Sequence, residues 1–349
     1  MQFFSNTESC MKSTFSHRCF SLTRRLVARF SKIQRTKSMS KVDVAFPEFE
    51  RLKHYYNTSD KNVPPVLYLG DSVVERVSQH DIDTRDLGRM VTDNLWHTLR
   101  VLCISHSAYQ IKLFNAFVCA LASMKYRPRI VILPINLRSF SPQWDMNPAW
   151  QFIEELRIIE KFAQTPLLGP MKADKHTLSI DEFEDTIVSY PHTSFTRIGQ
   201  FRQLIKMRAE EDERKAFRWQ QIFIFHYMHP LTREHPKLCL IQNTVARLGE
   251  LGILVLAYVT PVNFQTGRKL IGADFTTAIQ HQVNLVGEQV SCTRQAEAVR
   301  LLDFSTMLSS DFFFHEYDPT EHLNEYGRRV ISKKISDEVI AFSKGYSGV

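Results

Sequence analysis

Residues 65–72, with the sequence Pro-Val-Leu-Tyr-Leu-Gly-Asp-Ser, contain a short apolar run that ends in a tight turn. A run of this length, bounded by Pro65 and Gly70, is typical of a strand that is buried on both faces. Asp71 is a good helix N-cap, so a helix is expected to begin at Ser72. The stretch therefore predicts a strand, a turn and a helix, which is the opening unit of an α/β fold.

The same type of apolar run recurs along the chain, and five buried strands imply a parallel sheet. The other four are expected at residues 100–104, 129–133, 253–258 and 301–304.

Helical periodicity separates these runs. It covers Phe114 to Leu121, Leu238 to Leu248 and a closing helix from Ile331 to Phe342. Helices on both faces of a parallel sheet give a three-layer α/β/α sandwich with a flavodoxin-like five-stranded sheet. Sites in such folds lie at the carboxyl ends of the strands.

The connection between the third and fourth strands is far longer than a crossover needs. We therefore expect a mainly helical insertion at about 141–235 within a domain spanning 46–349. Aromatic residues are dense in it, and they either pack the core of the insertion or form a lid above the site. The most prominent are Trp144, Trp150, Phe152, Tyr190, Phe195, Phe201, Phe217, Trp219, Phe223, Phe225 and Tyr227.

The N-terminal segment 1–45 is expected to be a basic arm, because residues 1–41 hold nine Lys/Arg and one acid, Glu8. A transit peptide, a membrane-surface segment and a solvated extension all fit it. The remainder has 35 basic and 36 acidic residues, which argues against a nucleic-acid-binding face. The six cysteines form no C-x-x-C pair, and no apolar run is long enough to cross a bilayer, so a cytoplasmic location is expected.

Ser72 and His322 are the residues that suggest chemistry. Gly-Asp-Ser alone is ordinary turn chemistry, and a histidine before a helix is usually a cap or a surface residue. A serine hydroxyl is a poor nucleophile unless an imidazole accepts its proton, and residues 315–327 supply that imidazole just before the last helix. The pair therefore predicts nucleophilic catalysis.

Gly70-Asp71-Ser72 after the first strand, together with His322-Leu-Asn-x-x-Gly327, resembles the SGNH (GDSL-like) hydrolase superfamily over most of residues 64–345. The resemblance implies that Ser72 is the nucleophile and His322 its base. It also implies that Asn136 is an oxyanion donor beside the Ser72 amide, although the flanking Gly and Asp of the family's Gly-x-Asn-Asp turn are missing. The family's remaining donor, a Gly amide after the second strand, has no Gly here, and Ser107 takes that place.

The acid that would orient His322 departs from the family's spacing, because Pro319 stands three residues before the histidine. Asp318 is the predicted acid. There are two alternatives: Glu321 or Asp311 takes the place of Asp318, or Ser72 and His322 act as a dyad in which a backbone carbonyl orients the histidine.

Arg138 and Asn263 follow the third and fourth strands, so we place them with Asp71 among the predicted substrate-binding residues. Pairing of Arg138 with a protein carboxylate and turn chemistry at Asn263 are the structural alternatives. His226, His229 and His235 lie close in sequence but lack a clear further ligand, so no metal is expected. There is no Gly-rich phosphate loop, and no cofactor is expected.

These features favour a serine esterase-type hydrolase acting on an ester of an acetylated carbohydrate, a lipid or a small acyl group. An O-acyltransferase using the same site is one alternative, and a non-catalytic binding protein that retains the fold is the other.

Overall fold

The computed structural model describes residues 46–58, 63–141, 152–167, 212–229, 231–291, 296–319 and 321–345. All of them belong to one unit, Phe46–Val349. The predicted basic arm at 1–45 lies outside the described residues.

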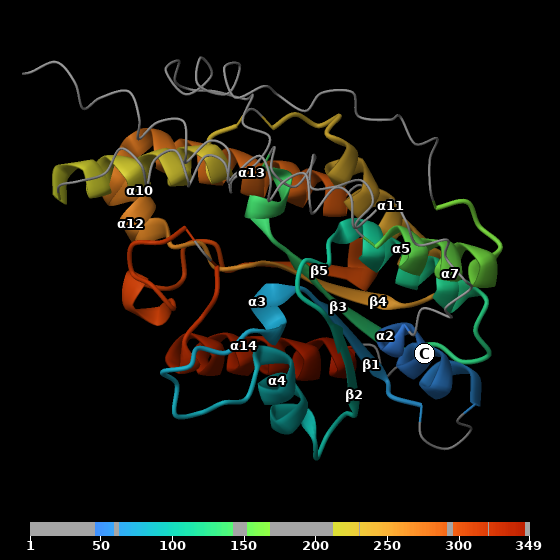
Figure 1. Ribbon diagram of the computed structural model, residues 1–349. Coiled ribbons are helices and arrows are strands. Elements are labelled where there is room, and N and C mark those ends of the chain that lie inside the picture. Colours follow the sequence, from blue (N-terminus) through green and yellow to red (C-terminus); the bar gives the residue numbers. More distant parts are fainter. Residues whose placement is uncertain are drawn as a thin grey trace, which may run out of the picture. The chain divides into compact units, whose positions relative to one another are not determined.

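A five-stranded, all-parallel sheet forms the centre of this unit (Figure 1). Its strands are β1 (Val66–Gly70), β2 (Val101–Ser105), β3 (Ile130–Ile135), β4 (Leu254–Val259) and β5 (Val299–Asp303), in the order β2-β1-β3-β4-β5. Every residue of β1, β3 and β4 is buried, as expected for strands covered on both faces. The five predicted strands are confirmed as strands, and the order is that of flavodoxin-like folds. The prediction that all five are buried is wrong for the two edge strands, because β2 is buried only at alternate residues and no residue of β5 is buried.

Helices cover both faces of the sheet, which confirms the three-layer sandwich (Figure 1). One face packs against α2 (Pro47–Lys53), α5 (Ile111–Ala122), α7 (Ile153–Ala163), α11 (Pro236–Glu250) and α13 (Ala273–Ser291). The opposite face packs against α4 (Leu87–Leu95) and α14 (Glu325–Gly345). On that second face Tyr68 of β1 and Tyr258 of β4 share a hydroxyl hydrogen bond of 2.6 Å.

Short elements complete the fold. They are the π-helical turn η1 (His54–Thr58), α3 (Ser72–Glu75), α12 (Phe264–Ile271) and the 3-10 turns η2 (Leu137–Phe140), η3 (Ala296–Ala298) and η4 (Ser310–Phe312). Three of them, α3, η2 and η4, lie in the connections that carry the predicted site residues.

Between β3 and β4 the structure describes η2, α7, α10 (Asp212–Tyr227) and α11, so the described part of the predicted insertion is helical. Phe223 and Tyr227 of α10 contact Phe275 of α13, with ring centroids 5.7 and 5.8 Å apart. These two aromatics therefore pack a core. Trp144, Trp150, Tyr190, Phe195 and Phe201 lie outside the described residues.

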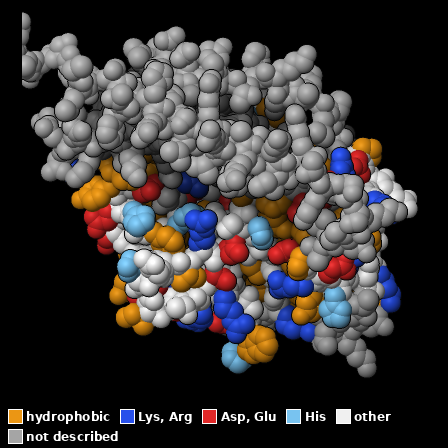
Figure 2. Space-filling model, viewed as in Figure 1, with side chains coloured by type: hydrophobic (Ala, Val, Ile, Leu, Met, Phe, Trp, Pro, Cys, Tyr) orange, Lys and Arg blue, Asp and Glu red, His pale blue; other side chains and the backbone are white. Residues whose placement is uncertain are grey.

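The surface of the described residues carries both charge signs. On the face drawn in Figure 2, Lys and Arg side chains are interspersed with Asp and Glu side chains. None of the described helices has the length and apolar character that a membrane-crossing segment requires.

The strand order determines where a site can form. After β1 the chain adds β2 on one side of it and then crosses over to add β3 on the other side. In folds of this type the crevice for a site forms where the strand order reverses, which here is at the carboxyl ends of β1 and β3. Ser72 follows β1 and Asn136 follows β3, so both lie at this edge.

Candidate active site

The turn after β1 places Ser72 at the first position of α3. Asp71 caps this helix, because its Oδ1 accepts a 2.8 Å hydrogen bond from the Val73 amide. Gly70 is required by close packing, since a Cβ there would lie 2.7 Å from the Cβ of Val74 and 2.9 Å from that of Ser105. The Gly-Asp-Ser sequence thus has a local structural reason as well as a predicted chemical one.

His322 lies in the loop before α14, and this loop is held by local hydrogen bonds. Phe313 and Leu323 form an antiparallel bridge, and the Phe314 amide donates to the His322 carbonyl at 2.9 Å. Asn324 caps α14, because its Oδ1 accepts from the amides of Tyr326 and Gly327 at 3.1 Å each. The backbone that carries the imidazole is therefore fixed on both sides of His322.

Ser72 and His322 meet although 250 positions separate them. The distance between Ser72 Oγ and His322 Nε2 is 3.1 Å, within hydrogen-bonding range. His322 is buried and Ser72 is partly exposed, so the pair lies at the boundary between the interior and the surface. A hydroxyl and an imidazole in this arrangement can exchange a proton.

The imidazole is neutral at physiological pH. Burial, and then electrostatic repulsion from the Arg138 and Arg76 side chains, lower the pKa of His322 to about 3. A neutral ring can accept the proton that Ser72 loses on attack, and negative charge developing on a bound carbonyl would stabilise the resulting imidazolium.

A buried arginine of α14 anchors the histidine loop. Arg328 is fully buried, and its Nη1 donates to Asp81 Oδ2 at 2.6 Å and to the Leu323 carbonyl at 2.8 Å. Its Nη2 and Nε donate to the carbonyls of Asp83 and Arg85. The guanidinium therefore joins residue 323, next to His322, to the loop between α3 and α4.

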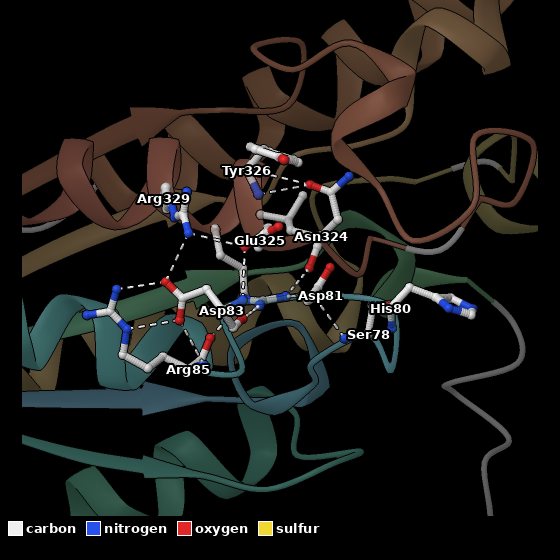
Figure 3. Close-up of polar contacts among 12 residues, drawn as sticks. Ser78, His80, Asp81, Asp83, Arg85, Asn324, Glu325, Tyr326 and Arg329 are labelled. Atoms are coloured by element: carbon white, nitrogen blue, oxygen red, sulfur yellow. Dashed lines mark hydrogen bonds and ion pairs between the residues drawn. The ribbon is translucent and has the colours of Figure 1, made fainter.

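Figure 3 shows the polar contacts that extend this network around Asp83 and Glu325. Glu325, in the first turn of α14, accepts from the Asp83 amide at 2.9 Å and from Arg329 at 3.1 Å. Asp83 also pairs with Arg85 at 2.7 Å. The loop that follows α3 is thus attached to the helix that follows His322, which holds the Ser72 side and the His322 side of the candidate site together.

Asn136 lies beside Ser72 in a small pocket. Its Nδ2 donates to Asp71 Oδ2 at 3.4 Å, a long hydrogen bond, and its Oδ1 is buried without a partner among the described residues. The pocket is lined by Asp71, Ser72, Ala108, Tyr109, Gln110, Asn136, Arg138 and Ser139. Asn136 is therefore next to the predicted nucleophile, where an oxyanion donor is needed.

The loop after β2 contributes Ala108 to this pocket. The backbone of Ala108 has a φ of 70°, a left-handed conformation that favours glycine. Ser107, the residue predicted as a backbone donor, donates its hydroxyl to Glu75 Oε2 at 2.9 Å and is not among the residues lining the pocket. Sequence reasoning missed Ala108 because no Gly marks the left-handed position.

Asn263 is completely buried and supports the 315–318 segment. Its Nδ2 donates to the carbonyls of Glu316 at 2.8 Å and Asp318 at 3.2 Å, and its Oδ1 accepts from Ser310. These contacts agree with the structural alternative for Asn263. Among the described contacts, no hydrogen bond joins Asp318 to His322, and Asp318 stays a prediction as the orienting acid.

Glu321, an alternative acid, is also completely buried but is bound elsewhere. Its Oε1 accepts from Tyr227 of α10 at 2.8 Å and from the Arg138 amide at 3.3 Å, and its Oε2 accepts from Thr260 at 2.8 Å. Burial raises its pKa to about 7, and Arg138, Thr260 and Tyr227 limit the rise. Glu321 thus connects the histidine loop to the ends of β3 and β4 and to the insertion.

Arg138 is 8% exposed, and its Nε has no hydrogen-bond acceptor within the described ranges. Burial raises the pKa values of Asp71 and Glu321 and lowers that of His322. The positive charge of Arg138 limits the two rises and adds to the lowering at His322, so the guanidinium acts electrostatically on all three groups. Within the described residues no ion pair joins Arg138 to a carboxylate, so the structural alternative stays a prediction, and Arg138 lines the pocket beside Ser72.

The three histidines considered as metal ligands occupy different elements. His226 is buried in α10, His229 follows that helix, and His235 caps α11 by accepting from the Lys237 amide at 3.3 Å. Within the described ranges no group of three or more His, Cys, Asp or Glu side chains is arranged to hold a metal ion.

The chain was compared with models of known protein families and with curated proteins, and neither comparison found a match. The resemblance to SGNH hydrolases therefore rests on the motifs quoted from the sequence.

Proposed function

We propose that this protein is a serine esterase-type hydrolase that cleaves an ester bond through an acyl-enzyme intermediate. The observation that carries the proposal is the 3.1 Å contact between Ser72 Oγ and His322 Nε2 at the carboxyl edge of a parallel sheet. A neutral imidazole within hydrogen-bonding distance of the hydroxyl of a partly exposed serine is what general-base activation of that hydroxyl requires.

The chemical steps follow from this contact. Ser72 Oγ attacks the ester carbonyl while its proton passes to His322 Nε2, and a tetrahedral intermediate forms. The imidazolium then gives that proton to the leaving alcohol oxygen, and the acyl group remains on Ser72. A water molecule, deprotonated by the same imidazole, releases the acid and restores the serine.

The negative charge on the former carbonyl oxygen needs donors in the pocket beside Ser72. The Ser72 amide and Asn136 Nδ2 are the proposed donors, because Asn136 makes only a long bond of 3.4 Å to Asp71. The Ala108 amide is the third proposed donor, replacing Ser107, because the backbone of Ala108 lines the same pocket in a left-handed conformation. We retain Asp318 as the proposed orienting acid.

The proposed setting is a reducing compartment such as the cytoplasm. The described cysteines Cys103, Cys119 and Cys239 are free thiols, which agrees with this setting.

Steady-state hydrolysis of short-chain nitrophenyl esters tests the proposal. Ser72→Ala should lower kcat/KM by at least about 10³-fold, because the residual rate comes only from binding and the oxyanion donors. Ser123→Ala, at an exposed position that ends α5, is the matched control and should keep the wild-type rate. Equal activity of the two variants would remove the proposal.

The same acyl-enzyme permits an O-acyltransferase, in which an alcohol takes the place of water. Adding sugar or lipid alcohols during turnover separates the two activities. Hydrolysis predicts release of the free acid at an unchanged rate with every acceptor, whereas acylated acceptor as the main product would replace hydrolysis with transfer.

A further inference from the structure

Arg138 is a buried charged residue to which the proposed chemical steps assign no role. It lies in η2, two residues after Asn136, and it is 8% exposed. Burying a guanidinium is costly unless its N–H groups are used, yet Nε has no acceptor among the described residues. A positive charge held in this way at a site indicates that negative charge appears near it at some stage.

The pocket that Arg138 lines is the place where such charge would form. Ser72, Asn136 and Ala108 line it as well, and its volume is about 10 Å³, which is room for one water-sized group. One oxygen atom next to the Ser72 hydroxyl fills this space. The pocket is thus placed to receive the oxygen of a tetrahedral intermediate formed on Ser72.

We propose that the Arg138 guanidinium is a catalytic residue that stabilises the negative charge on the carbonyl oxygen during attack by Ser72. The inference rests on the proposed function and adds a charged group to it, since the resemblance to SGNH hydrolases implies only uncharged amide donors. Fixed charge in a site that excludes water acts strongly on charge that develops in the transition state.

Asp71 gives a second reason for a cation at this point. Its carboxylate caps α3 and lines the same pocket, so it repels an oxyanion formed there. Glu321 lies close enough for its pKa to respond to the same guanidinium. Arg138 offsets the charge of Asp71 in this pocket, so an oxyanion formed there meets a positive charge as well as a negative one.

Arg76 provides a matched control. It is exposed at the end of α3, it acts on the pKa of His322 as Arg138 does, and it is not among the residues lining the pocket. Removing either positive charge should raise the pKa of His322 and move the acid limb of the kcat/KM profile to higher pH. Only the loss of Arg138 should also reduce the rate on the pH-independent plateau.

The experiment compares Arg138→Gln, Arg138→Lys and Arg76→Gln with wild type, using nitrophenyl acetate and an acidic ester, the mono-nitrophenyl ester of glutaric acid. Arg138→Gln should lower kcat about 10²- to 10³-fold with both esters while KM changes by less than about threefold. Arg76→Gln should keep the plateau kcat within about twofold. A plateau kcat for Arg138→Gln within about threefold of wild type would overturn the inference.

A loss confined to KM for the acidic ester would also overturn it, because Arg138 would then bind a substrate carboxylate. Thermal melting monitors folding, and if Arg138→Gln does not fold, Arg138→Lys decides. Lysine keeps the charge without the planar donor fork, so its kcat should fall at least about tenfold, and an unchanged kcat would contradict the inference. Activity that depends on Ser72 but not on Arg138 removes this inference alone, whereas a wild-type rate equal to that of Ser72→Ala removes the proposed function as well.

Discussion

Glu321 and His322 are neighbours in the chain, both are buried, and their pKa values move in opposite directions. Burial raises the pKa of the Glu321 carboxyl to about 7 and lowers that of His322 to about 3. In each case burial favours the neutral form. The two residues have different partners. The Glu321 carboxylate accepts hydrogen bonds from two hydroxyls and one backbone amide, whereas the His322 imidazole contacts Ser72.

Glu321→Gln should change how stability depends on pH. The carboxyl has a folded pKa of about 7 against an ordinary value of 4.5, so the folded state binds its proton more tightly. The contribution is fully present below about pH 4.5 and is lost as pH rises through about 7. The Gln variant has no carboxyl to titrate and lacks this contribution. Between about pH 4.5 and pH 8 the free energy of unfolding of wild type should therefore fall, relative to that of the variant, by up to about 3 kcal/mol.

Urea denaturation of both proteins at pH 4.5, 6 and 8 measures the difference. Glutamine can still hydrogen bond with the hydroxyls of Tyr227 and Thr260, because a hydroxyl both donates and accepts. A constant difference across the three pH values would contradict the account of Glu321.

The base should remain active in mild acid. With a His322 pKa of about 3, the imidazole stays unprotonated at pH 5, and kcat/KM should fall by less than about twofold between pH 7 and pH 5. Stability has the opposite trend from that of Glu321, since a depressed histidine pKa withdraws stability as pH falls from about 6.5 towards 3. Circular dichroism at each pH therefore accompanies the rate measurement. Half-loss of kcat/KM near pH 6.5 in a folded protein would show that the ring titrates normally.

At the scale of secondary-structure elements, α14 links the site to the rest of the molecule. Arg328 and Arg329 are adjacent in this helix, but the side chain of Arg328 is fully buried against Asp81 whereas that of Arg329 is 52% exposed. The two arginines carry the same charge but differ in burial. Comparing their variants therefore shows how much burial of the charge contributes to stability.

Arg328→Met should lower the free energy of unfolding by about 3–5 kcal/mol, because Asp81 and three carbonyl groups lose their donor inside the protein. Arg329→Met should change it by less than about 1 kcal/mol, since exposed ion pairs contribute little. Chemical denaturation of the two variants makes the comparison. Similar losses for both would mean that the buried network does not anchor the helix.

The elements also differ in how far the sequence predicted them. The strands β1 to β5 were predictable because short apolar runs between turn signals are typical of strands in a parallel sheet that helices cover. The placement of Ser72 and Asn136 was predictable from motifs at the ends of β1 and β3, and that of His322 from the motif before the last helix. The left-handed Ala108 was not, since no Gly marks it, and neither was the Glu321 cluster, whose partners Tyr227 and Thr260 come from distant elements.

At the scale of the whole molecule, the parallel sheet is what makes a site possible. The order β2-β1-β3-β4-β5 brings the residues after β1, β2 and β3 to one edge, and the loop before α14 returns to the same edge. Four segments that are far apart in the sequence therefore contribute Ser72, Ala108, Asn136 and His322 to one place. The buried Arg328 and Glu321 hold these segments together.

Covalent labelling of Ser72 is the measurement that tests the central claim most directly. The full-length protein is treated with a fluorophosphonate, which reacts with serine hydroxyls activated by a neighbouring base, and the adduct is located by peptide mass spectrometry. The account predicts a single adduct on the peptide containing Ser72, absent in Ser72→Ala and at least about tenfold slower to form in His322→Ala. An adduct on another residue, or a rate unchanged in His322→Ala, would contradict it.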